Sequence, residues 1–168
     1  MNKSKTIQLN SLCNNIVELN NNKYMFSMSN SIGVINKETQ SIEKQITINE
    51  KSVNRIIQLK NNNIATCSDE GLITIYSGDN FQIIQTIKEP DKITNIIELS
   101  NGDLFSINVD KRMRFYKYHK DKYEINYIYE EGEMLVDSYE INHNKIIYLT
   151  YSGRLLKLKI YDMNKKKK

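Results

Sequence analysis

Polar side chains recur at one position of this sequence and are its first candidates for chemistry. Glu18, Gln58, Glu98 and Glu140 follow one another at intervals of 40, 40 and 42 residues. Carboxylate oxygens can hold a cation, and paired carboxyl groups can transfer protons. The pattern allows a cation-binding channel or a cation-dependent enzyme. The favoured interpretation is that these polar side chains simply face water or bond a neighbouring repeat.

A second polar position lies three residues before the first in each repeat. It is occupied by Asn15, Arg55, Asn95 and Asp137. Because both positions are polar in every repeat, we expect the eight side chains to form a surface that faces a protein or peptide partner. Charge reversal at Arg55 or Asp137 is therefore expected to weaken binding without unfolding the chain.

Other catalytic groups are scarce. His119 and His143 are the only histidines, and neither lies in a spacing typical of metal ligands. The two cysteines form no CxxC pair; Cys67 lies in an apolar run and is expected to be a buried packing residue. No glycine-rich phosphate loop is present. The sequence predicts a non-catalytic protein without a metal or cofactor.

Charge and hydropathy narrow the class of partner. The 168 residues carry 24 Lys and Arg against 20 Asp and Glu, a net charge of +4, and the sequence ends in four lysines. The rest is therefore neutral, which argues against a specific nucleic-acid-binding face. No apolar run approaches the length of a membrane span, and the first ten residues lack the apolar core of a secretory signal. We expect an intracellular, cytoplasmic protein, with the nucleus left open.

An internal repeat organises the chain. The tetrapeptides IVEL, IIQL and IIEL begin at residues 16, 56 and 96, and a weaker copy, SYEI, begins at residue 138. A short polar turn and a second apolar run follow each copy. We divide the chain into an arm (1–12), four repeats (13–52, 53–92, 93–133 and 134–161) and a basic tail (162–168). A fixed period of this length is typical of repeat architectures.

Each repeat reads as short strands joined by hairpins. The second repeat predicts strands at 53–59, 64–68, 72–76 and 82–87, rich in isoleucine and threonine and bounded by Asn, Asp, Gly and Ser. The only proline, Pro90, falls in the connection to the next repeat, where no ladder hydrogen bond is lost. Four strands per repeat predict one antiparallel sheet, and its two apolar faces must be covered by neighbouring sheets.

Residues 64–76 (IATCSDEGLITIY) and 109–116 (VDKRMRFY) resemble the second strand, turn and third strand of a WD-repeat β-propeller blade. The resemblance covers roughly residues 13–160 and implies that Asp69 and Asp110 are structural turn aspartates. Tyr76 and Tyr116 stand in place of the family's tryptophan, with Asn36 and Leu158 as poorer matches. The family's Gly-His and Trp-Asp pairs are absent from every repeat.

The resemblance implies an all-β propeller of about four antiparallel four-stranded blades, as either an incomplete or an assembling ring. The fourth repeat is short of a last strand, and residues 6–9 (TIQL) resemble the N-terminal strand that closes the last blade in the family. The ring could close on itself, by pairing with a second chain, or within a longer propeller. The implied function is a protein-interaction scaffold. A truncated propeller without independent activity is the remaining alternative.

Overall fold

Four antiparallel sheets, each one blade, make up the part of the chain that the structure describes. The structure is a computed structural model and describes residues 6–9, 11–48 and 52–165. Blade 1 contains β1 (Ile16–Leu19), β2 (Lys23–Met28), β3 (Ser31–Asn36) and β4 (Ser41–Thr47). Blade 2 contains β5 (Val53–Gln58), β6 (Ile64–Ser68), β7 (Leu72–Tyr76) and β8 (Ile83–Lys88). Blade 3 contains β9 (Ile93–Glu98), β10 (Leu104–Asn108), β11 (Arg112–His119) and β12 (Lys122–Glu130). Blade 4 contains β13 (Met134–Asn142), β14 (Lys145–Tyr151) and β15 (Leu156–Asp162), followed by the 3-10 turn η1 (Met163–Lys165).

The strands within each blade pair in sequence order, as hairpins require. The turn after the first strand has the same form in blades 2 and 3. The Leu59 N–H donates to Asn63 O and the Leu99 N–H to Asp103 O, both at 2.8 Å. Asn62 and Gly102 occupy the same place in this turn with φ of 66° and 86°. Asparagine and glycine tolerate that left-handed conformation best, so the polar turn residues fix where the strands reverse.

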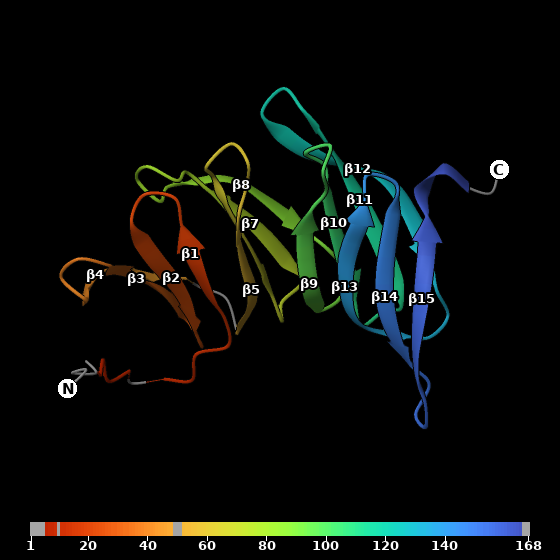
Figure 1. Cartoon of the computed structure of the whole chain (residues 1–168), viewed down its shortest axis with the longest axis horizontal. Helices are drawn as coiled ribbons and strands as arrows, with labels where there is room; N and C mark the ends of the chain where they lie inside the picture. Colours follow the sequence, from red (N-terminus) through yellow and green to blue (C-terminus); the bar gives the residue numbers. More distant parts are fainter. Residues whose placement is uncertain (1–5, 10, 49–51, 166–168) are drawn as a thin grey trace.

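Blades stack face to face, and one apolar cluster fills each junction. The cluster between blades 1 and 2 includes Met25, Val34, Ile56 and Tyr76. The next includes Ala65, Ile75, Ile96 and Tyr116, and the third includes Phe105, Phe115, Ile146 and Tyr161. The blades therefore cover each other's apolar faces, as the repeat predicts. Figure 1 shows the four blades side by side in chain order, with blades 1 and 4 at opposite ends of the row.

The strand predictions for the second repeat are confirmed to within one residue at each end. The tryptophan-like positions need correction. Strand pairing places Ile35 and Tyr161, rather than Asn36 and Leu158, level with Tyr76 and Tyr116. The equivalent positions in the third strands are the pairing partners of equivalent residues in the second strands. Those second-strand residues are Tyr24, Ile64, Leu104 and Ile146. Asn36 and Leu158 pair with other residues, so each lies out of register with Tyr76 and Tyr116.

The sequence makes two predictions about the ends of the chain. The first, that the fourth repeat lacks a last strand, is confirmed: blade 4 has three strands, and β15 is its outer strand. Residues 6–9 form no strand in this structure, so a closing role for the arm stays a prediction. The arm is tied instead to the β2–β3 turn, where the Ser29 N–H donates to Ser11 Oγ at 3.2 Å. Of the basic tail, residues 162–165 belong to the end of β15 and to η1, and residues 166–168 lie outside the described residues.

Candidate functional site

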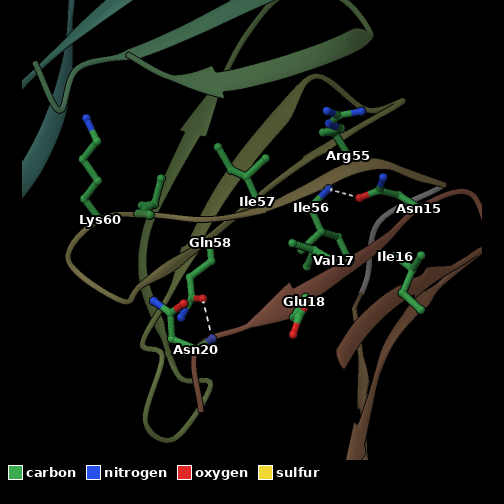
Figure 2. Close-up of a pocket in the computed structure, with 11 residues that line it drawn as sticks. Asn15, Ile16, Val17, Glu18, Asn20, Arg55, Ile56, Ile57, Gln58 and Lys60 are labelled. Atoms are coloured by element: carbon green, nitrogen blue, oxygen red, sulfur yellow. Dashed lines mark hydrogen bonds between the residues drawn. The ribbon is translucent and has the colours of Figure 1, made fainter. Parts of the chain in front are cut away.

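The first strands of the blades line a concave surface. The hollow between β1 and β5 has a volume of about 680 Å³, and Figure 2 shows the side chains that surround it. A second hollow of about 320 Å³ lies between β5, β9 and β13. Arg55 and Ile57 line both hollows, and Ile97 and Tyr139 line the second. We call this surface the inner groove.

The first polar set connects blades to one another. Gln58 Oε1 accepts the Asn20 N–H at 2.9 Å, as Figure 2 shows. Glu98 Oε2 accepts the Lys60 N–H at 2.8 Å, and Glu140 Oε2 accepts the Ser100 N–H at 2.7 Å. Each acceptor belongs to one blade and each donor to the turn of the blade before it. The same contact therefore occurs at all three junctions between blades.

Glu18 has the same position in blade 1, where no described blade precedes it. Its carboxylate instead receives the ammonium group of Lys37. The three carboxylates of the set thus have different partners: a lysine side chain for Glu18 and backbone donors for Glu98 and Glu140. Partial burial raises the pKa of Glu98, opposed by the bond from the Lys60 N–H. No group of three metal-ligating side chains occurs among the described residues.

The second polar set is divided between junctions and groove. Asn15 Oδ1 accepts the Ile56 N–H at 2.9 Å, and Asn95 Nδ2 donates to Asp137 Oδ1 at 2.7 Å. These contacts join blade 1 to blade 2 and blade 3 to blade 4. Arg55 has no ion pair with any residue in the described ranges and lines both hollows of the inner groove; Figure 2 shows it beside Asn15 and Ile56. Asp137, the other charged member of this set, receives the Asn95 amide and the Ser138 N–H and shares a third hollow with Arg55.

The two turn aspartates lie in equivalent turns but one position apart. The turn of blade 2 follows Ser68 at the end of β6, and the turn of blade 3 follows Asn108 at the end of β10. Counting from these two residues, Asp69 corresponds to Val109 and Glu70 corresponds to Asp110. Asp69 accepts from Asn54 Nδ2 at 2.7 Å and pairs with Lys92, and Asp110 accepts the Arg112 N–H at 3.1 Å. Both carboxylates therefore hold local structure, through different donors.

A buried polar network centred on Glu89 and Arg114 is not predicted from the sequence. Glu89, in the connection between blades 2 and 3, receives the hydroxyl groups of Tyr116 and Ser106 and forms an ion pair with Arg114 at 3.0 Å. Arg114 also pairs with Asp110. Burial raises the pKa of Glu89, while its hydrogen bonds from Tyr116 and Ser106 and the charge of Arg114 oppose the shift. The sequence feature that could have pointed to this network is that Glu89 directly precedes Pro90, the only proline in the sequence.

The remaining candidates have packing or surface roles. Cys67 is fully buried in the cluster between blades 2 and 3. Tyr127 and Tyr129, on the outer strand of blade 3, pack against the cluster between blades 3 and 4, and the Tyr129 and Tyr161 ring centroids are 5.0 Å apart. His119 lies exposed at the end of β11, and the His143 ring contacts the hydroxyl group of Ser100. Within the described part of the chain, no helix is long and apolar enough to cross a membrane.

Comparison with known proteins places this architecture. No family model matches the sequence, and no curated protein matches it. The structure is similar to the WD40 β-propeller domain of Doa1, with a TM-score of 0.75 and 17% identity over 90% of this chain and 51% of that chain. It is also similar to the computationally designed Ika4 protein, with a TM-score of 0.76 and 12% identity over 97% of this chain and 99% of that chain.

The chain thus spans about half the length of the WD40 propeller chain that it matches. At these identities the similarity concerns the fold. Sheet order, repeat length and stacking agree with it: each sheet is an antiparallel meander, and each junction buries the same two faces. The chain folds as four consecutive blades of β-propeller type.

Proposed function

We propose that this chain is a non-catalytic protein-interaction module that holds a protein or peptide segment in the inner groove. Propeller blades present their loops and first strands to partners, which is the use that the fold suggests. The observation that carries the proposal is Arg55. Its charged side chain meets two hollows of the groove and has no ion-pair partner in the described ranges. A cytoplasmic location is part of the same proposal.

The groove favours one kind of partner. Ile57, Ile97 and Tyr139 supply apolar area beside Arg55. An extended segment with an acidic side chain next to an apolar one would pair its carboxylate with the guanidinium and pack its apolar group on these side chains. Six of the eight predicted partner-facing residues form hydrogen bonds across the blade junctions, namely Asn15, Gln58, Asn95, Glu98, Asp137 and Glu140.

A displayed library of random peptides, selected on the immobilised chain, tests the proposal. We expect the wild-type chain to enrich acidic–apolar peptides and Arg55→Glu to lose at least tenfold in affinity for them, roughly the effect of losing a charge-assisted contact. Lys117→Glu is the matched control, since Lys117 is exposed on β11 away from the groove. Equal affinity in wild type and Arg55→Glu, or loss in both variants, would contradict the proposal.

A further inference from the structure

The two ends of the row of blades carry faces that the interior blades bury. One row of three side chains crosses each sheet on the face that meets the next blade. In chain order the rows are Val17–Met25–Val34, Ile57–Ala65–Ile75, Ile97–Phe105–Phe115 and Tyr139–Ile147–Ile160. We call this the trailing face. The opposite face of each blade, which meets the blade before it, is the leading face.

The trailing face of blade 4 is apolar and open. Met25, Ala65 and Phe105, the central members of the first three rows, are at most 1% exposed. In blade 4, by contrast, Tyr139 is 70% exposed and Ile160 is 60% exposed. Leu156 and Leu158 continue this apolar surface along β15 and are equally exposed. The trailing faces of blades 1, 2 and 3 are each covered by the next blade, but no described residues cover the trailing face of blade 4.

The leading face of blade 1 is its counterpart. The repeat predicts like surroundings for Ile16, Ile56 and Ile96, and Ile56 and Ile96 are 2% and 0% exposed. Ile16 is 60% exposed because no described blade lies in front of blade 1. Tyr24 and Ile42 extend the same exposed edge of blade 1. The exception in the repeat therefore follows from the open end of the row.

The polar contacts at the junctions have open ends as well. Within the chain, Gln58, Glu98 and Glu140 each bond the turn that follows the first strand of the preceding blade. Glu18 is the corresponding side chain on the leading face of blade 1, and its side chain is largely exposed. The β13–β14 turn is the corresponding turn of blade 4, beyond which no described blade follows. Blade 1 thus carries an acceptor side chain, Glu18, and blade 4 carries the kind of turn that such an acceptor bonds within the chain.

We propose that a second copy of this chain occupies these faces, with the trailing face of blade 4 of each copy against the leading face of blade 1 of the other. The chain itself supplies the argument, because it already joins these two kinds of face at three junctions with one pattern of apolar rows and one polar contact. Two such contacts related by a twofold axis close a ring of eight blades, within the range known for propellers. The trailing face shares Tyr139 with the inner groove, whereas Ile160, Leu156 and Leu158 lie outside the two hollows that define the groove.

Light scattering on the 168-residue chain tests it. We expect twice the mass of one chain at micromolar concentration. Leu158→Lys on the trailing face and Ile16→Glu on the leading face should each weaken association by roughly tenfold to a hundredfold, because each buries a charge at the contact. Ile125→Glu is the matched control: Ile125 is 51% exposed, but on an interior blade. Circular dichroism should show the same β spectrum for all three variants.

Mixing the two face variants distinguishes head-to-tail contact from other arrangements. A mixture of Leu158→Lys and Ile16→Glu chains keeps one junction of two unmodified faces, so dimers should reappear. The inference is overturned by a monomeric wild-type chain, by dimers that survive in both variants, by a mixture that stays monomeric, or by a series of larger masses that never closes. Peptide selection on the groove has its own outcome, so failure here leaves the proposed function separately testable.

Discussion

Arg114 and Glu89 are charged side chains held almost entirely away from water. Arg114 is paired with both Glu89 and Asp110, and Glu89 also receives the hydroxyl group of Tyr116. Removing Glu89 leaves the buried charge of Arg114 with one carboxylate partner instead of two, which is more costly than losing an exposed ion pair. The network therefore holds blade 3 to the connection from blade 2.

Glu89→Ala is expected to lower the free energy of unfolding by about 3–5 kcal/mol, because Arg114 keeps only Asp110 as a carboxylate partner. Glu130→Ala is the control in the same blade: it breaks the exposed Arg112–Glu130 pair and should cost no more than about 1 kcal/mol. Urea unfolding followed by circular dichroism measures both. Similar losses in the two variants would mean that the buried network contributes little.

At the scale of the element, blade 4 is held by two carboxylates that come before its first strand. Glu131 receives the Tyr148 hydroxyl group and the Lys159 ammonium group. Glu133 receives Thr150 Oγ1 at 2.7 Å and pairs with Lys157 and Lys159. Since these donors lie on β14 and β15, the connection between blades 3 and 4 is tied to the whole of the last sheet.

This arrangement predicts a pH dependence of stability. Hydrogen bonds from Lys157, Thr150 and Lys159 lower the pKa of Glu133 from 4.5 to about 2. Between those values the unfolded chain binds the proton more readily than the folded chain, so the contribution of Glu133 is present above pH 4.5 and lost as the pH falls toward 2. Urea midpoints measured from pH 6 to pH 2 should fall less steeply for Glu133→Gln than for the wild type. Glu124→Gln, at an exposed site on β12, should follow the wild type; parallel curves for all three would refute the assignment.

The contact between a first-strand acceptor and the preceding turn yields a further prediction. Glu98→Ala removes the 2.8 Å acceptor of the Lys60 N–H. Because this hydrogen bond is exposed, water can take the acceptor's place, and we expect a loss of about 0.5–1 kcal/mol in the free energy of unfolding. Glu98→Gln keeps an acceptor oxygen and should recover most of that loss. Equal destabilisation by the two substitutions would show that the charge, rather than the hydrogen bond, matters at Glu98.

Strands and turns were predictable because their causes are local. Alternating apolar residues define β5 to β8, and Asn62 and Gly102 mark turns whose φ values those residues tolerate. The junction contacts of Gln58 and Glu98 were visible only as a recurring polar position, since their donors lie 38 residues away. The Glu89 network combines the connection after blade 2 with two strands of blade 3, and such convergence depends on packing that no local pattern records.

At the scale of the whole molecule, stability is expected to vary along the row of blades. In stacked repeats each unit is stabilised by its neighbours, so units at the ends have fewer stabilising interfaces than interior ones. Blades 2 and 3 are covered on both faces. Blade 1, by contrast, exposes Ile16 and Tyr24 on a leading face where Phe26 is buried, and blade 4 exposes Tyr139 and Ile160 on its trailing face. Closing two copies into a ring would remove this difference. It would also turn the inner groove into the wall of a channel, which an extended peptide fits better than a folded partner.

Amide hydrogen exchange at two chain concentrations would reveal both effects. In dilute solution we expect β6 and β10 to exchange most slowly, because every residue of both strands is buried, and β14 to exchange faster through local opening of the last blade. Raising the concentration should slow exchange in β14, since association stabilises the closed state by mass action. Leu158→Lys should abolish that dependence and leave β6 and β10 the slowest. Uniform protection across the four blades in dilute solution would contradict the graded stability, and protection in β14 that ignores concentration would contradict closure by a second copy.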